Sequence, residues 1–194
     1  MVGSDPRSGG STLRKDCVKN RRASNPHHSN TYKQDYSCNL KVYHQIVWGL
    51  KGKLNLLSSS LYFDLTHVVC LTEHHLKDQE MDLASIEHYK LSATFCRQQY
   101  KNGGTCILVH ESIPTDHFCK EKDLEMCTIK LNLYKTNIVI IVIYRSPSGN
   151  YGYFLRKLES FLKSLCTIKM EFIICGDINM DYLHNHSRKQ QICC

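Results

Sequence analysis

The sequence has 194 residues, of which 42% are hydrophobic, and a formal net charge of +7 with the histidines counted as neutral. This length suits one domain, or one domain with a tail. No run of about eighteen apolar residues is present, so we predict no membrane span, and the polar N-terminus carries no secretory signal. We therefore expect an intracellular protein, nuclear or cytoplasmic and not secreted, whose positive charge favours polyanionic partners without identifying one.

The 11 cysteines include no C-x-x-C pair and none at zinc-ligand spacing with histidine. The absence of a signal favours a reducing compartment, where cysteines remain thiols. We therefore predict free thiols in the core rather than a disulfide framework or a zinc site. The cysteines that lie within apolar stretches are Cys70, Cys106, Cys127, Cys166 and Cys175.

Residues 1–37 contain few aliphatic side chains and carry seven basic residues against three acidic ones. Such a segment cannot bury enough apolar surface to offset the entropy lost on ordering, so we predict a disordered basic tail. The tail could contact nucleic acid, serve as a targeting signal or simply be solvated. We place the domain itself at residues 38–185 and a second polar tail at residues 186–194.

The domain begins with a predicted β-α-β unit. Residues 40–47 predict a strand, and apolar residues over positions 50–61 recur at helical spacing. Residues 68–71 predict a second, buried strand that ends in polar residues. Because the two strands enclose one helix, Glu73 lies at the carboxyl end of the second strand.

A run of strands follows. Residues 89–95 and 105–110 predict an antiparallel hairpin, joined by a polar loop with a Gly-Gly pair. Residues 124–131 predict a strand of mixed polarity. Residues 137–144 form the most apolar run in the sequence and predict a central strand covered on both faces. This run stops shortly before a proline, which cannot continue a ladder.

The last elements repeat the β-α-β pattern. Apolar residues at helical spacing between Tyr151 and Cys166 predict an amphipathic helix. Residues 172–175 predict a last buried strand, which leads into a glycine and then into polar side chains at alternate positions. The order of all these elements favours an α/β sandwich with a substantial antiparallel component.

Three strands that we predict to be buried thus end in polar side chains, and strand ends commonly present residues to a ligand. If the three ends converge, Glu73 could bind Mg²⁺ and Asp177 could orient or deprotonate a water. Asn179 and Arg145 could hold phosphate oxygens, and Tyr144 could donate a hydrogen bond to one. Each residue taken singly is better explained as an ordinary turn or surface residue.

The motifs at these strand ends occur in an order that resembles the endonuclease/exonuclease/phosphatase superfamily, and more narrowly the endonuclease domain of non-LTR retrotransposon proteins. The resemblance covers roughly residues 40–183. The residues that carry it are His44-Gln45-x-x-x-Gly49-Leu50-x-x-Lys53, Leu71-Thr72-Glu73-His74-His75-Leu76, Gly103-Gly104, Leu124-Glu125, Ile143-Tyr144-Arg145-Ser146-Pro147 and Gly176-Asp177-Ile178-Asn179-Met180-Asp181.

The resemblance implies a deoxyribonuclease-like four-layer α/β/β/α sandwich and phosphodiester hydrolysis that depends on Mg²⁺ (or Mn²⁺). The implied reaction is the nicking of DNA to prime reverse transcription, and no protein partner is predicted. Position by position, Glu73 matches the metal-binding glutamate and Tyr144 the active-site tyrosine of the family. Asp177 and Asn179 match the Asp and Asn that place the water and the scissile phosphate.

Two departures from the family pattern predict impaired activity. The family has an Asn three residues before Gly49, where this chain has Ile46, which can neither ligate a metal nor bond a phosphate. The family also ends in a Ser-Asp-His motif, and nothing after Asn179 matches it. We therefore expect that the C-terminal strands of the domain are missing, which would expose an apolar sheet edge. Loss of one stabilising group of this kind commonly lowers the rate by about a hundred- to a thousandfold.

Three functions stay open at this point. The chain is a DNA-nicking endonuclease domain of a retroelement, a catalytically inactive retroelement remnant that at most binds nucleic acid, or a phosphatase of the same superfamily. The motif from His44 to Leu50 argues against the phosphatase. Ile46 and the absent C-terminal motif favour the remnant.

Overall fold

The structure is a computed structural model that describes residues 39–64, 66–99, 102–119, 123–133, 136–166 and 170–180. Every described residue belongs to one compact unit, which lies within Lys33–Cys194. The predicted tails over residues 1–37 and 186–194 lie outside the described residues. No helix in the described part is long and apolar enough to cross a membrane.

The first sheet has the strand order β1-β2-β4-β3. Its members are β1 (Val42–Ile46), β2 (Val68–Thr72), β4 (Thr105–His110) and β3 (Tyr89–Phe95). Strands β1 and β2 are parallel, whereas β4 runs antiparallel to both of its neighbours. The predicted β-α-β unit and the predicted hairpin are therefore confirmed.

The second sheet has the strand order β5-β6-β7-β8. Its members are β5 (Thr115–His117), β6 (Glu125–Asn132), β7 (Asn137–Tyr144) and β8 (Glu171–Asp177). Strands β7 and β8 are parallel and the other pairs are antiparallel. The sequence did not predict β5, because its three residues are polar and carry no periodic signal.

Helices α1 (Leu54–Asp64) and α2 (Tyr151–Leu165) connect the parallel strands of the two sheets. Helix α2 begins where the side chain of Asn150 accepts a hydrogen bond from the backbone N–H of Tyr153, at 2.8 Å. Its apolar side chains then recur at helical spacing, and Phe154, Phe161 and Leu165 are buried. A short 3₁₀ helix, η1 (Asp78–Leu83), was not predicted.

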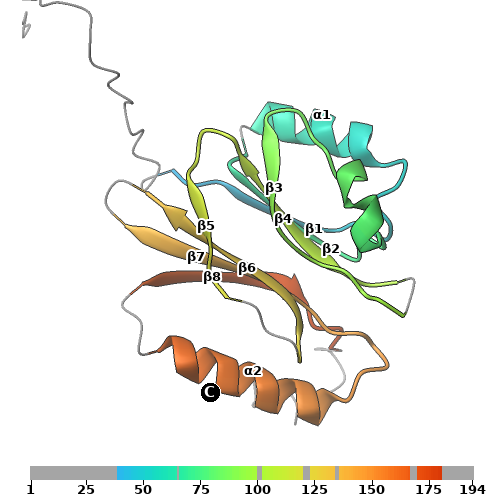
Figure 1. The fold of residues 1–194 in the computed structure, drawn as a ribbon, viewed down its shortest axis with the longest axis vertical. Coiled ribbons are helices and arrows are strands. Elements are labelled where there is room, and N and C mark those ends of the chain that lie inside the picture. Colours follow the sequence, from blue (N-terminus) through green and yellow to red (C-terminus); the bar gives the residue numbers. More distant parts are fainter. Residues whose placement is uncertain are drawn as a thin grey trace, which may run out of the picture. The chain divides into compact units, whose positions relative to one another are not determined.

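The described elements stack in four layers, with α1 and η1 on the outer face of the first sheet and α2 on that of the second (Figure 1). Between the sheets, fully buried residues such as Cys70 and Ile107 pack against Ile129 and Ile140. The structure therefore has the predicted α/β/β/α sandwich. This arrangement brings the carboxyl ends of β2 and β7 to the same end of the space between the sheets.

Strand β7 shows why its sequence is apolar without alternation. Ile138, Ile140 and Val142 face the first sheet. The intervening residues pack against α2 instead. Both faces of the strand are therefore buried, and the prediction of a central strand covered on both faces is confirmed.

Strand β8 differs from its prediction as a buried strand. In the described part of the second sheet it pairs with β7 alone, and the side chain of Ile174 is 48% exposed. Ile173 and Cys175 are only half-buried, although they pack toward the first sheet. The short apolar run was correctly assigned as a strand, but an apolar run does not distinguish a central strand from an edge.

The cysteine prediction is confirmed for Cys70, Cys106 and Cys127, which are free thiols buried in the core. Cys175 is a free thiol that is only half-buried. The prediction is wrong for Cys166, which is exposed. This residue follows the last buried position of α2 and forms the end of the helix, so its apolar neighbours in sequence do not surround it in space.

Candidate active site

The predicted site residues lie at the carboxyl ends of β2, β7 and β8. Glu73 directly follows β2, while Tyr144 ends β7 and has Asp177 as its register partner on β8. Glu73 and Tyr144 share a hollow of about 590 Å³. The other residues that line this hollow are Trp48, His75, Arg97, Asn102, Ser146 and Pro147. Asp177 and Asn179 are not among its lining residues.

The backbone holds Glu73 in a fixed position. Its φ angle is +58°, which is uncommon for a residue other than glycine. Its N–H donates to the carbonyl of Gly104 and its own carbonyl accepts from the N–H of Gly49, both at 2.8 Å. Its side chain is 13% exposed and has a carboxylate oxygen 3.8 Å from Nε2 of His75. A carboxylate is therefore presented to the hollow from a backbone fixed on both sides.

Neighbouring His74 explains why a pair of glycines stands opposite Glu73. The ring of His74 is fully buried, with Nδ1 accepting from the N–H of Leu76 and Nε2 lying 3.1 Å from the carbonyl oxygen of Phe95. A Cβ on Gly104 would lie 2.5 Å from this ring. The glycine thus allows β4 to approach the end of β2 closely enough to bond Glu73. His74 is a structural residue in this arrangement.

Tyr144 is a hydrogen-bond donor in the hollow. Its side chain is 4% exposed, and burial, together with the hydrogen bond to Glu73 and the negative charge of that residue, raises the pKa of Tyr144 well above its ordinary value of 10. The phenol is therefore protonated at neutral pH. The guanidinium of Arg97 lies 5.5 Å from the centroid of the Tyr144 ring, within the range of a cation–π contact.

Arg97 is a site residue that the sequence did not reveal. It forms a bidentate pair with Glu125, with Nε donating to Oε2 at 2.7 Å and Nη2 donating to Oε1. The pair joins the loop after β3 to the start of β6, and so links the two sheets beside the hollow. In the sequence, Arg97 is one polar residue in a polar loop, and no spacing marks it.

The turn after β8 is organised by Arg145. The guanidinium is 7% exposed and donates to four carbonyl oxygens, those of Ser146, Gly149, Ile178 and Asn179. These bonds occupy all three guanidinium nitrogens. Such an arrangement suits a residue that positions the turn, rather than the phosphate contact that the sequence suggested.

Asp177 and Asn179 bond within this same turn. Oδ1 of Asp177 accepts from the backbone N–H of Asn179 at 2.8 Å, and Nδ2 of Asn179 donates to the carbonyl of Arg145 at 2.7 Å. Across the sheets, His44 of β1 lies near Asp177. Burial lowers the pKa of His44 below its ordinary value, and the charge of Asp177 partly opposes this shift. His44 is therefore neutral at pH 7.

Unpaired polar atoms gather at the same end of the first sheet. Within the described residues, three buried side-chain atoms have no hydrogen-bond partner, and they are Nε2 of His44, Oγ1 of Thr72 and Nε2 of His75. Two of these residues flank Glu73 in the sequence. Buried polar groups are normally satisfied, so such a group indicates a place where water, an ion or a ligand binds.

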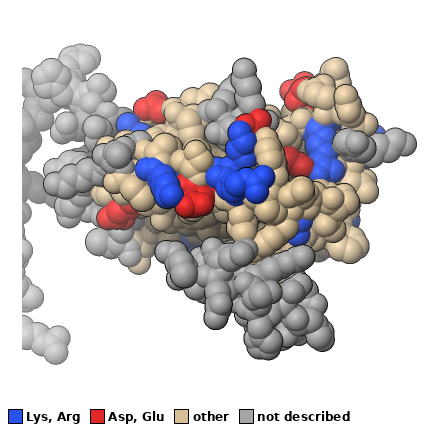
Figure 2. Space-filling model, turned by 90° about the horizontal axis from the view of Figure 1, so that it is seen from below, with Lys and Arg blue, Asp and Glu red and all other residues tan. Residues whose placement is uncertain are grey.

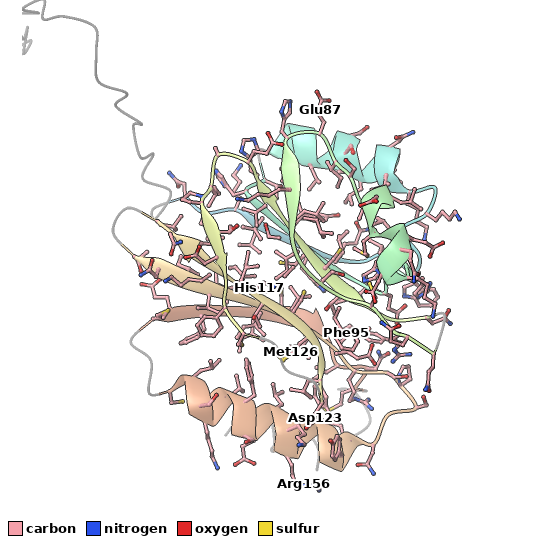
Figure 3. The ribbon with its side chains drawn as sticks, in the orientation of Figure 1. Glu87, Phe95, His117, Asp123, Met126 and Arg156 are labelled. Atoms are coloured by element: carbon pink, nitrogen blue, oxygen red, sulfur yellow. The ribbon has the colours of Figure 1, made fainter. Side chains whose placement is uncertain are left out.

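A larger hollow, of about 1040 Å³, adjoins the first and shares Arg97 and Ser146 with it. Phe95, His117 and Met126, which Figure 3 labels, line it from the two sheets. Neither Glu73 nor Tyr144 lines this larger hollow. Glu73 and Tyr144 are therefore in the smaller one, while Glu125 lines the larger one, which extends along the gap between β3 and β6.

On the face that carries α2, Lys and Arg side chains are interspersed with Asp and Glu (Figure 2). Lys157 pairs with Asp123, and Lys163 pairs with Glu159 at 2.6 Å. Exposed pairs of this kind add little stability. The two carboxylates partly neutralise the two lysines. These lysines therefore do not form a purely positive surface.

Three of the similar solved structures are endonucleases or an endonuclease domain. The endonuclease domain of TRAS1, a telomere-specific non-LTR retrotransposon, has a TM-score of 0.61 and 11% identity, with 79% of this chain and 68% of that chain covered. The AP endonuclease LMAP from Leishmania major has a TM-score of 0.57 and 19% identity, covering 71% and 54%. An AP endonuclease from Archaeoglobus fulgidus has a TM-score of 0.52 and 18% identity, covering 78% and 62%.

The chain has the fold of these endonucleases, which is the fold that the resemblance implied. Among these structures, the TRAS1 endonuclease domain agrees with the narrower resemblance to retrotransposon endonucleases. The chain spans between 54% and 68% of the three structures' own lengths. Protein-family models and curated proteins give no match to the sequence.

Proposed function

We propose that this chain is a phosphodiesterase domain that acts on a nucleic-acid strand at the hollow between Glu73 and Tyr144. The observation that carries the proposal is that a fixed carboxylate and a buried, protonated phenol share one hollow at the carboxyl ends of two strands. Clefts outside the carboxyl ends of strands are the usual ligand sites of α/β folds. The nuclease domains with this fold support the same reaction class.

A divalent cation such as Mg²⁺ or Mn²⁺ fits this site through Glu73. Among the described residues, no three His, Cys, Asp or Glu side chains are grouped closely enough to hold a metal. Mg²⁺ nevertheless is commonly bound by one or two carboxylates, with water and substrate phosphate as its other ligands. The unpaired Nε2 of His75, which lines the same hollow as Glu73, would bond such a water. The cation would neutralise charge on the phosphate.

The remaining steps belong to the chain's own side chains. Tyr144 donates a hydrogen bond to a phosphate oxygen once the substrate competes with Glu73 for its proton. Asp177 orients the attacking water, and Asn179 holds the scissile phosphate from the turn that Arg145 fixes. The neighbouring cation of Arg97 contributes positive potential beside the phosphate.

One observation favours a second candidate, an inactive remnant that only binds nucleic acid. Ile46 stands at the end of β1 with a side chain that is 40% exposed, where the resembling family has an Asn. An apolar side chain here supplies no ligand and no hydrogen bond. The phosphatase alternative has no such specific support, so a nucleic-acid strand remains the proposed substrate.

A plasmid-nicking assay with Mg²⁺ separates the two candidates. The full chain should nick supercoiled DNA slowly, and Glu73→Gln and Asp177→Asn should each lower the rate by about a hundredfold or more. Arg156→Gln, an exposed change on α2, is the matched control and should nick like the wild type. Nicking that survives both active-site substitutions would come from a contaminant and would contradict the proposal.

A further inference from the structure

The side chain of Trp48 is unusual in its exposure. It is the only tryptophan in the sequence, and it is 73% exposed, although burial of an indole is strongly favourable. It lines the same hollow as Glu73 and Tyr144. Tryptophan is enriched at interfaces, and this exposed indole lies beside a polar site, so it is a candidate contact for a partner.

The loop that carries Trp48 is held rigidly on both sides. Before Trp48, the N–H of Val47 donates to the carbonyl of Thr72 at 3.0 Å. After it, the N–H of Gly49 donates to the carbonyl of Glu73 at 2.8 Å. Nζ of Lys53 donates to the carbonyls of Val47 and Trp48 at 2.6 and 2.9 Å. Trp48 itself has a φ angle of +46°, which bulky residues rarely adopt. The indole is therefore presented to solvent by a fixed backbone.

The chemistry around the indole points to one class of ligand. The bond from the N–H of Gly49, the residue after Trp48, holds this loop beside Glu73, which the proposed function places beside the scissile phosphate. The group next to a phosphodiester in a nucleic-acid strand is a base, and any unstacked base can stack on an aromatic ring. A hollow of about 590 Å³ is within the range of sites for ligands the size of a nucleotide.

We propose that Trp48 is a nucleobase-stacking residue, and that the strand bound at this site presents an unstacked base next to the phosphate held near Glu73. The inference rests on the proposed function for the identity of the ligand. It adds that binding depends on the base as well as on the phosphate backbone. A sequence-tolerant preference for unpaired over paired strands follows, because a paired base keeps its faces stacked within the duplex.

Because Trp48 is the single tryptophan, its fluorescence reports directly on this contact. The full chain is titrated, in EDTA so that no hydrolysis occurs, with a short oligothymidylate and with an abasic oligomer of equal length and charge. The expected result is strong quenching by the oligothymidylate and weak quenching by the abasic oligomer. Equal quenching by both, or none by either, overturns the inference.

Binding of a fluorophore-labelled oligothymidylate, followed by anisotropy, supplies the second measurement. Trp48→Ala should weaken binding by on the order of tenfold, and Trp48→Phe should retain part of the affinity. Tyr153→Ala removes an aromatic side chain that is 43% exposed on α2 and should leave binding unchanged. If Trp48→Ala bound the oligothymidylate with wild-type affinity, the indole would not be a base-stacking residue, and the proposal would be overturned. If the oligothymidylate quenched the fluorescence but the chain did not nick plasmid DNA, the stacking site would stand and the proposed hydrolytic function would be refuted.

Discussion

At the scale of single residues, Ile46 is the position where the chain departs from the nuclease pattern. It ends β1, pairs in register with Thr72 and is 40% exposed. Ile46→Asn adds an amide that can bond a phosphate or a metal-bound water, at little cost in stability because the site is partly open. We expect the nicking rate to rise at least about tenfold. Ile174→Asn, at a similarly exposed isoleucine of β8, is the control and should change nothing.

The buried phenol of Tyr144 predicts a pH dependence of stability. Because its folded-state pKa is raised above the ordinary value of 10, the folded protein holds this proton more tightly than the unfolded chain does. Its contribution is complete below about pH 10 and is lost as the pH rises further. The wild-type Tm should therefore fall more steeply above about pH 10 than that of Tyr144→Phe. Tyr153→Phe, at an exposed tyrosine, should follow the wild type, and parallel curves for all three would refute the prediction.

At the scale of elements, the end of β8 depends on Gly176. Its φ angle is +147°, and a Cβ here would lie well inside contact distance of the carbonyl oxygen of Ile143 on β7. Gly176→Ala must push the two parallel strands apart beside Asp177. We expect a loss of about 2–4 kcal/mol in the free energy of unfolding, measured with urea.

Another glycine offers a matched control for that substitution. Gly152 is exposed in α2, and a Cβ there would have only ordinary van der Waals neighbours, the nearest at 3.6 Å. Gly152→Ala should stabilise the protein by up to about 1 kcal/mol, because it lowers the entropy of the unfolded chain. Similar effects of the two substitutions would show that the close approach of β7 and β8 at Gly176 is not a constraint.

The elements that the sequence predicted well are those with a clear apolar run or with apolar residues at helical spacing. The hairpin strands and β7 were predicted with the bounds that the structure has. Nearly all side chains of β4 and β7 are buried, whereas in β3 only Ala93 is. Strand β5 and helix η1 were missed because short polar segments carry no period. The exposure of β8 was missed because edge position is a property of topology rather than of local sequence.

The residues of the candidate site also fall into those that the sequence indicated and those that it did not. Glu73 and Tyr144 were found because each follows an apolar run that ends abruptly. Trp48 and Arg97 lie in the loops after β1 and β3, and only the folding of the first sheet brings them to the same hollow. The role of Arg145 could not be predicted, because its four carbonyl partners come from a turn and from a segment more than thirty residues away.

At the scale of the whole molecule, buried thiols in two different cores report on whether the molecule unfolds as one unit. Cys106 lies in the core between the first sheet and its covering helices, and Cys127 lies in the core between the two sheets. Burial raises the pKa of Cys127 to about 12 and raises that of Cys106 well above its ordinary value. Neither forms a reactive thiolate near pH 8 in the folded protein. Cys166 is exposed at the end of α2 and should react with iodoacetamide at once. As urea is raised, alkylation of Cys106 and Cys127, located by peptide mass analysis, should follow the global unfolding transition. Early labelling of Cys127 alone would instead mean that the second sheet opens independently, and would contradict a single cooperative sandwich.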